Sequence, residues 1–228
     1  MGNLCIIPAR GGSKRIPRKN IKLFLGKPIV AYSIQAALDS QLFDEVMVST
    51  DDLEIAEIAK QYGAKVPFMR SEKNADDFAT TYQVIEEVVL RYKSEMNTEF
   101  DAVCCLYSCA PFVTKGSLKK GYTKLIENQY DTVFPIIAFS FPIQRALKHE
   151  NGKVAMIEEA HLVTRSQDLE ERFHDAGQFY WGKTNALLHS KKLLTSNSGG
   201  VIISEIEAQD IDTETDWKLA ELKYQLIQ

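Results

Sequence analysis

Patterns typical of buried strands and of amphipathic helices alternate along most of the chain. Continuous apolar runs, as in strands covered on both faces, lie at residues 3–9, 45–50, 102–107 and 132–138. A helical pattern begins at Pro28, and a longer amphipathic one runs through about 80–95. Repeated strand–helix units predict an α/β fold with a Rossmann-like, mostly parallel sheet.

Local signals predict where shorter elements begin. Asp52 is suited to cap a helix, because its carboxylate can accept hydrogen bonds from the first turn. Residues 65–69 predict a short strand. Thr213 with Asp216 resembles a capping box at the start of the last helix.

The alternation breaks between residues 139 and 183. The elements there are short and irregular, with a turn signal at Asn151-Gly152 and an aromatic stretch at 178–181. We expect one domain over residues 1–228, in which 139–183 is a lid or dimerisation insertion.

Composition narrows the class of protein. The chain has 228 residues, 45% of them hydrophobic and 25% charged, as expected for one large globular domain. A net charge of −4 argues against a general nucleic-acid or membrane-surface binder. No secretory signal is visible, and no run approaches the ~18 apolar residues of a membrane span. With four cysteines interpreted as buried, reduced thiols, these features predict a cytoplasmic protein.

The most informative segment is a glycine-containing basic loop directly after the first apolar run. It holds five cations and no acid: Arg10, Lys14, Arg15, Arg18 and Lys19. Parallel sheets bind ligands at the carboxyl ends of their strands, where this loop must lie. Gly11 and Gly12 would let the backbone approach a ligand and present N–H groups to an anion. The loop matches neither GxxxxGK[ST] nor GxGxxG. It indicates a small, highly anionic ligand; the alternative is a solvated basic loop.

These residues carry a family resemblance that extends along most of the chain. The stretch IIPARGGSKRIPRKN resembles the signature of the CMP-sialic acid synthetases, which are cytidylyltransferases that activate nine-carbon acidic sugars. Further resemblance is carried by VSTDD at 48–52, GAKVPFMRS at 63–71 and QDIDTETDW at 209–217. LYSCAPF at 106–112 and GQFYWGK at 177–183 are most similar to the branch that makes CMP-pseudaminic acid.

The resemblance implies the reaction of CTP with a nonulosonic acid to give the CMP-sugar and pyrophosphate, with Mg²⁺ assistance. The anomeric hydroxyl of the sugar would attack the α-phosphorus. Pseudaminic acid is the expected sugar, with N-acetylneuraminate and legionaminic acid as alternatives. A non-catalytic nucleotide sensor is a further alternative, although sensing alone needs no metal-binding pair. The resemblance also implies a homodimer in which residues 139–183 reach the partner's site.

Roles of single residues follow from the same resemblance. The implied nucleotide-binding residues are Arg10, Gly11, Gly12, Ser13, Lys14, Lys19, Asn20, Arg70 and Thr81. The implied sugar-binding residues are Tyr107, Arg165, Gln178 and Tyr180. Arg10, Lys14 and Asp212 are the expected catalytic residues. Tyr180 or Trp181 could pack on the acyl groups of the sugar, and the alternative for the aromatic stretch at 178–181 is core or a dimer interface.

Asp210 and Asp212 match the metal-binding pair of the family. Residues two apart in extended backbone face the same way, so both carboxylates can reach one ion. Mg²⁺ prefers such oxygen ligands together with phosphate and water. The alternative is an acidic cluster at a helix entry, in which Asp212 or Thr213 is a cap.

The chain departs from the sialic acid pattern at several positions. Tyr107 and Cys109 stand where that pattern has glutamine and threonine. Gln144 aligns with a lysine of the pattern and has Arg145 beside it, so either could meet the sugar carboxylate. Asp51, after the second strand, either contacts ligand or orders the loop.

Overall fold

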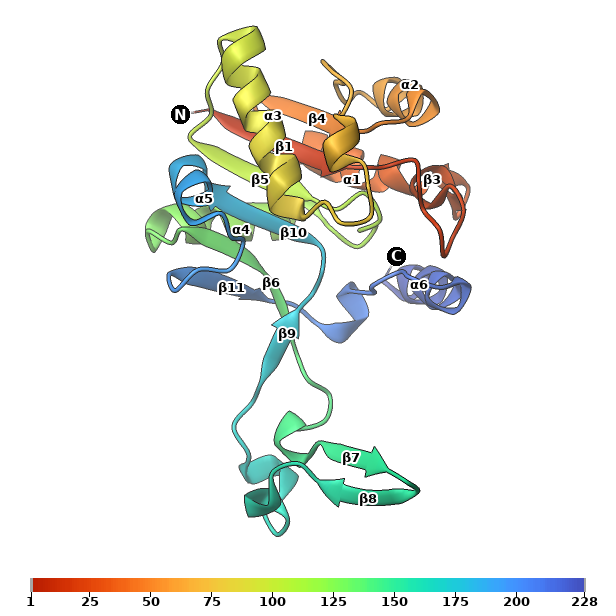
Figure 1. The fold of residues 1–228 in the computed structure, drawn as a ribbon, viewed down its shortest axis with the longest axis vertical. Helices are drawn as coiled ribbons and strands as arrows, with labels where there is room; N and C mark the ends of the chain where they lie inside the picture. The colour runs from red at the N-terminus through yellow and green to blue at the C-terminus, as the bar shows by residue number, and fades with distance from the viewer. Residues whose placement is uncertain (1, 228) are drawn as a thin grey trace.

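A computed structural model describes residues 2–227, and its centre is a seven-stranded sheet (Figure 1). The main path runs in the order β11-β6-β10-β5-β1-β4, and β9 pairs with β6 beyond it. The strands are β1 (Asn3–Pro8), β4 (Glu45–Ser49), β5 (Ala102–Leu106), β6 (Thr132–Ala138), β9 (Phe173–Asp175), β10 (Phe179–Lys183) and β11 (Ser198–Ile202). Only β9 and β10 run antiparallel to their neighbours. The predicted α/β class with a mostly parallel sheet is confirmed.

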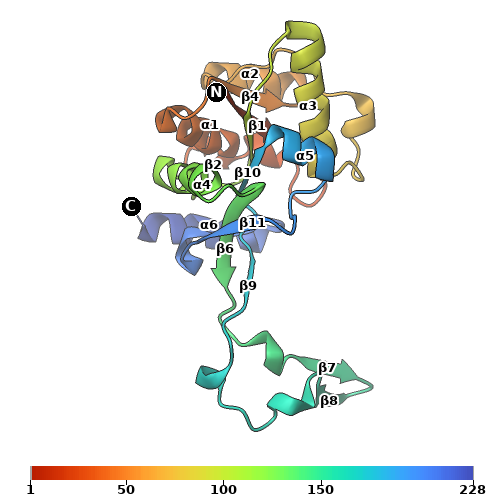
Figure 2. The same ribbon diagram turned by 90° about the vertical axis from the view of Figure 1, so that its left-hand side faces the viewer.

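Helices cover both faces of the sheet (Figure 2). One face carries α1 (Ile29–Ser40), α2 (Leu53–Gln61) and α4 (Lys115–Glu127). The other carries α3 (Thr81–Met96) and α5 (Thr184–Ser190). The last helix, α6 (Glu214–Leu226), packs Trp217 and Ala220 against Phe24 and Ile29. Strands buried on both faces explain the continuous apolar runs of the sequence.

Side-chain caps mark the starts of α2, α3, α4 and α6. The Asp52 carboxylate accepts a hydrogen bond from the Ile55 N–H at 3.0 Å, as the sequence predicts. Thr213 and Asp216 form the predicted capping box of α6. Pro28 is the residue before α1 rather than its first residue, because it ends a small hairpin of β2 (Leu23–Phe24) and β3 (Lys27–Pro28).

The strand predicted at residues 65–69 is not formed. Lys65 alone makes a parallel bridge, to Met47, with the Val48 N–H donating to its carbonyl at 2.9 Å. Pro67 follows and has no N–H to continue the ladder, so the pairing stops there.

The irregular segment projects away from the sheet on two connecting strands, β6 and β9 (Figures 1 and 2). It contains the hairpin of β7 (Leu147–Glu150) and β8 (Lys153–Met156), whose turn at Asn151-Gly152 has both residues at positive φ. The projecting segment is residues 139–172, shorter than the predicted 139–183. The rest returns to the main sheet, where β10 lies between β5 and β6 and Trp181 is fully buried.

Short 3-10 turns connect several of these elements: η1 (Lys19–Ile21), η2 (Glu72–Asn74), η3 (Ile143–Arg145), η4 (Glu159–His161), η5 (Ser166–Asp168) and η6 (Glu205–Glu207). Cys5, Cys104 and Cys105 are buried in the sheet, as expected, and Cys109 is partly exposed. Among residues 2–227, no helix has the length and apolar character to cross a membrane.

Candidate active site

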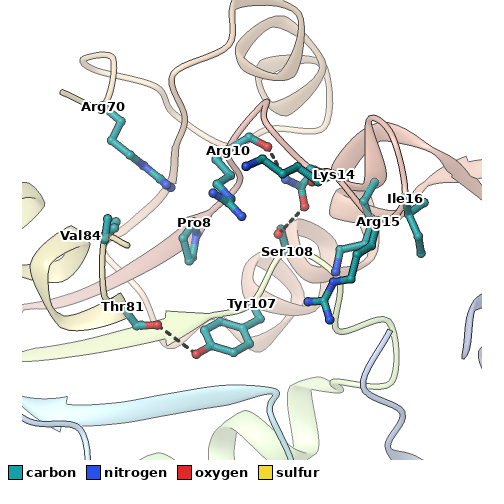
Figure 3. A pocket seen from close by; sticks show the side chains of 14 residues that line it. Pro8, Arg10, Lys14, Arg15, Ile16, Arg70, Thr81, Val84, Tyr107 and Ser108 are labelled. Atoms are coloured by element: carbon teal, nitrogen blue, oxygen red, sulfur yellow. Dashed lines mark hydrogen bonds between the residues drawn. The ribbon is translucent and has the colours of Figure 1, made fainter. Parts of the chain in front are cut away.

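A cavity of about 250 Å³ opens at the carboxyl ends of β1 and β5, beside the start of α3 (Figure 3). Five cationic side chains line it, from Arg10, Lys14, Arg15, Lys19 and Arg70. Within the described chain, no carboxylate belongs to its lining. A hollow lined by charges of one sign attracts the opposite charge, so the cavity is suited to a compact anion. The predicted basic loop therefore lies at the predicted edge.

The structure brings the two expected phosphate-binding cations together. Arg10 and Lys14 both contact the carboxylate of Asp77, and Arg10 also donates to the Asp76 carbonyl at 3.1 Å. The hydrogen bonds from Lys14 and Arg10 lower the pKa of Asp77, which is therefore an anion. The sequence carried no signal for Asp77, because it lies far from the loop along the chain.

The two glycines of the loop differ in what surrounds them. The Gly11 N–H was expected to face an anionic ligand. It instead donates a hydrogen bond to the carboxylate of Asp51 at 2.9 Å. A Cβ at Gly11 would lie 2.8 Å from an oxygen of Asp52, so only glycine fits there without a shift. Gly12 has open space where a Cβ would be. Asp51 thus orders the loop, and Gly12 and Ser13 are its open part.

Arg18 belongs to the same basic loop and faces elsewhere. Its guanidinium contacts Asp52 and Glu54 at the start of α2. The hydrogen bond from Arg18 holds the pKa of Asp52 below its usual value. One of the five loop cations therefore stabilises a helix start and does not line the cavity.

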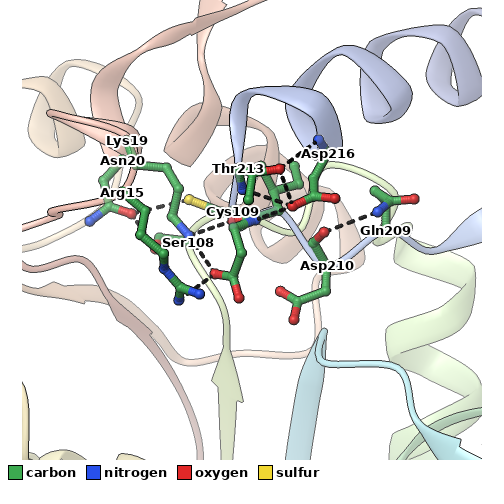
Figure 4. A network of polar contacts seen from close by, with 11 residues as sticks. Arg15, Lys19, Asn20, Ser108, Cys109, Gln209, Asp210, Thr213 and Asp216 are labelled. Atoms are coloured by element: carbon green, nitrogen blue, oxygen red, sulfur yellow. Dashed lines mark hydrogen bonds and ion pairs between the residues drawn. The ribbon is translucent and has the colours of Figure 1, made fainter. Parts of the chain in front are cut away.

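Asn20 is buried beneath the loop and joins it to the end of β5. Its amide donates to the Arg10 carbonyl at 2.8 Å. Its oxygen accepts from Ser108 at 2.7 Å and from the Cys109 thiol at 3.2 Å (Figure 4). Cys109 therefore keeps a hydrogen-bond donor at the position where the sialic acid pattern has a hydroxyl.

Arg70 enters the cavity from the opposite side to the loop (Figure 3). It is only 8% exposed and donates to the Ser49 hydroxyl at 3.0 Å and to the Ser49 carbonyl. Burial lowers the pKa of this guanidinium, and no carboxylate in residues 2–227 forms an ion pair with it. A buried charge without a carboxylate in an ion pair is costly and is typical of a binding site.

Thr81 and Tyr107 face each other across the cavity wall. Their hydroxyls are 3.0 Å apart, and both residues line the cavity. Burial raises the pKa of Tyr107, so its hydroxyl keeps its proton. Tyr107, expected at the sugar, therefore lies beside the expected nucleotide residues, with its ring 5.4 Å from that of Tyr180.

Gln178 and Tyr180 are buried next to a second cavity of about 380 Å³. Gln178 donates to the Glu207 carbonyl at 2.6 Å, and the Tyr180 hydroxyl donates to Asp175 at 2.7 Å. Asp175 and Asp210 both line this cavity. Asp175 was missed in the sequence, where it lies in the segment assigned to the insertion.

The structure does not bring Arg165 to this site within one chain. It lies in the projecting segment, where its side chain is 72% exposed and pairs with Asp168 at 2.7 Å. Gln144 and Arg145 lie in the same segment, and Arg145 donates to Ser166 at 3.2 Å. None of these three lines either cavity.

Asp212 stands beside the basic loop. Its carboxylate pairs with Arg15 at 2.7 Å and lies 3.7 Å from the Lys19 ammonium, which also donates to the Ile211 carbonyl at 2.6 Å (Figure 4). The capping role belongs to its neighbours: Asp216 accepts from the Thr213 N–H at 2.7 Å. Of the two caps that the alternative allowed, Thr213 is confirmed and Asp212 is wrong.

Asp210 differs from Asp212 in having no partner. Its carboxylate makes no hydrogen bond or ion pair within residues 2–227. Desolvation and the neighbouring Asp212 charge raise the pKa of Asp210. No group of three or more histidine, cysteine or acidic side chains suited to a metal occurs in the same range. The pair therefore fits a hard cation only if other oxygens complete its coordination, as phosphates do for Mg²⁺.

The fold is shared with solved structures over nearly the whole chain. It is similar to a CMP-2-keto-3-deoxy-manno-octonic acid synthetase solved in complex with CTP, with a TM-score of 0.71, 17% identity and coverage of 100% and 99% of the two chains. It is also similar to a 4-diphosphocytidyl-2C-methyl-D-erythritol synthase from Anaerococcus prevotii, with a TM-score of 0.63, 13% identity and 98% coverage of both chains.

Sequence comparison gives the family. The profile described as "Cytidylyltransferase" matches residues 4–213, and the chain belongs to this family of enzymes. A pseudaminic acid cytidylyltransferase of Campylobacter jejuni is 47% identical over 227 residues, covering 99% of this chain and 97% of that one. A CMP-N,N′-diacetyllegionaminic acid synthase of Legionella pneumophila is 33% identical over 247 residues, with the same coverage of 99% and 97%. The predicted family and enzyme class are confirmed.

Proposed function

We propose that this protein transfers the cytidylyl group of CTP to pseudaminic acid, giving CMP-pseudaminic acid and pyrophosphate. One observation carries the proposal: the cation-lined cavity, with its buried and unpaired Arg70, lies at the carboxyl ends of β1 and β5 in a cytidylyltransferase. The choice of sugar is supported by 47% identity to the C. jejuni enzyme, against 33% to the legionaminic acid synthase.

The basic loop is suited to the triphosphate. Arg10 and Lys14 already bind one anionic group together, and charge-assisted hydrogen bonds are the strong ones. Asn20 holds the Arg10 backbone in place from below. Arg70 is suited to the base, because cytosine O2 and N3 accept hydrogen bonds and a guanidinium offers five donors.

In the proposed reaction the anomeric hydroxyl of the sugar loses its proton to water, and its oxygen forms a bond to the α-phosphorus. The bond from that phosphorus to the bridging oxygen breaks, and pyrophosphate leaves with its electron pair. Arg10, Lys14 and Lys19 offset the charge on the phosphates. The acceleration of the transfer step therefore comes from positioning of the reactants and electrostatic stabilisation. Asp210 and Asp212 would hold Mg²⁺, which supplies further neutralisation of phosphate charge when bound.

The sugar would lie between the two cavities, near Tyr107 and Tyr180, with Gln178 supporting the wall. Its carboxylate needs a cation. Lys223 lines the second cavity, but its ammonium already donates to the carbonyls of Glu205 at 3.1 Å and Ala208 at 2.9 Å. We infer that a second copy supplies it from Arg165 or Arg145. The projecting segment supports a homodimer, because it exposes large apolar side chains such as Phe141 (82%) and Val163 (89%).

Calorimetric titration with CTP, UTP and ATP in Mg²⁺ tests the nucleotide part of the proposal. CTP is expected to bind at least about tenfold more tightly, since cytosine alone among these bases matches the donors of Arg70. Equal affinity for the three nucleotides would contradict this assignment of the cavity.

A further inference from the structure

Asp77 binds both expected phosphate-binding cations at once. Arg10 contacts one of its oxygens and Lys14 contacts the other, so a single anionic group bridges the two side chains. A phosphate presents its oxygens to an arginine and a lysine in the same bridging way. The carboxylate therefore lies on the very donors that the triphosphate needs.

The local backbone presents Asp77 at this point. It lies between η2 and α3, in a turn where the Asp76 carboxylate accepts from the N–H groups of Phe78 at 2.9 Å and Ala79 at 2.8 Å. Ala79 lines the cavity. Asp76 therefore orders the turn, and Asp77 is left to reach over the rim toward the loop.

The contact is not part of the hydrophobic core. The side chain of Asp77 is 36% exposed, and those of its partners Arg10 and Lys14 are 34% and 78% exposed. Ion pairs at such exposure stabilise a fold only weakly, so packing does not require this one. The ion pair instead reduces the fraction of molecules in which Arg10 and Lys14 are free to bind a phosphate.

We propose that Asp77 is an internal competitor of phosphate, which sets the affinity of the site for CTP and for pyrophosphate. This rests on the proposed role of Arg10 and Lys14 in binding the triphosphate. A carboxylate and a phosphate repel each other and compete for the N–H groups of Arg10 and Lys14, so the anion binds by displacing Asp77. The fraction of molecules with the pair formed then lowers the apparent affinity.

The same exchange acts on the product. As pyrophosphate leaves, Asp77 takes back Arg10 and Lys14, and the two cations are not left unpaired. Asp77 thereby weakens the binding of CTP and of pyrophosphate together. It affects the release of pyrophosphate as much as the binding of CTP.

The test is the variant Asp77→Asn, which keeps the shape of the side chain and removes its charge. Calorimetry with CTP and with pyrophosphate is expected to show about 1.5- to 5-fold tighter binding of both, the range that exposed ion pairs allow. Glu72→Gln is the matched control. It removes one negative charge from the same segment, on a residue that pairs with neither cation, and is expected to leave both affinities unchanged.

Unchanged or weaker binding of both anions by Asp77→Asn would overturn the proposal, as would an equal gain in Glu72→Gln. Arg10→Ala separates this inference from the function on which it rests. If Arg10→Ala loses CTP affinity and Asp77→Asn gains none, only the competitor role fails. If Arg10→Ala leaves the affinity unchanged, the phosphate role of the loop fails as well.

Discussion

Arg10 and Arg18 belong to one basic loop and contact different acidic groups. Arg10 lies at the cavity with Asp77, whereas Arg18 contacts Asp52 and Glu54 at the start of α2. The left-handed backbone at Arg18 (φ 55°) accompanies this divergence. Two arginines of similar sequence context therefore have separable roles.

Arg10→Ala is expected to weaken CTP binding by about 10- to 100-fold, because a charge-assisted hydrogen bond contributes about 1.5–3 kcal/mol. Arg18→Ala removes the same charge from the same loop and is expected to keep CTP affinity within about threefold, because the cavity does not include it. Calorimetric titration of both variants with CTP checks this. Equal losses would show that only the net charge of the loop matters.

Asp212→Asn is expected to lose most turnover while CTP binding largely survives. The amide is a poor ligand for Mg²⁺, whereas the loop cations that hold the phosphates remain. Asp216→Asn is the matched control, since Asp216 is the N3 residue of the α6 capping box, in which Thr213 is the N-cap. It should keep turnover and lose at most about 1 kcal/mol of unfolding free energy, because the amide oxygen still accepts hydrogen bonds. Steady-state pyrophosphate release and urea denaturation distinguish the two, and normal turnover in Asp212→Asn would remove it from the metal pair.

The unfolding free energy is expected to fall in acid partly through Asp52. The Arg18 hydrogen bond lowers the pKa of Asp52 in the folded protein, so the folded state binds this proton less readily than the unfolded chain. The stabilisation is complete above the unfolded pKa of about 3.9 and is lost as pH falls through the lower folded pKa. Urea denaturation between pH 7 and 3 should show a flatter profile for Asp52→Asn than for the native chain. Parallel profiles would exclude this linkage.

Val163→Asp should separate nucleotide binding from turnover. If a second copy covers the projecting segment, a charge at this exposed apolar position disrupts the dimer. Sedimentation is expected to show a monomer that still binds CTP and has lost turnover, because Arg165 lies away from its own cavity. His149→Asp, on the same segment, offers a polar control. A native chain that sediments as a fully active monomer would contradict the two-copy site.

Features with local causes could be predicted from the sequence. The buried run of β1, the cation loop after it and the Asp52 cap each depend on a few adjacent residues, and all three lie where expected. Asp210 and Asp212 also lie near the loop, because the segment before α6 crosses the same sheet edge.

Features that depend on distant pairing could not be predicted. An apolar aromatic run such as 179–183 has the same pattern in a core strand and in an interface, and only its pairing with β5 and β6 decides between them. Asp77 meets Arg10 across 67 positions of sequence. Tyr107, which follows β5, was expected at the site, but strand and helix patterns do not show its hydrogen bond to Thr81.

The most direct test of the proposed function is pyrophosphate release with CTP, Mg²⁺ and single nonulosonic acids. With pseudaminic acid, the reaction is expected to release one equivalent of pyrophosphate from CTP per CMP-sugar formed. The kcat/KM for this sugar is expected to lie well above that for N-acetylneuraminate or legionaminic acid. Turnover of N-acetylneuraminate with none of pseudaminic acid would contradict the substrate assignment. No release with any of the three sugars, by a protein that binds CTP, would contradict the proposed activity itself.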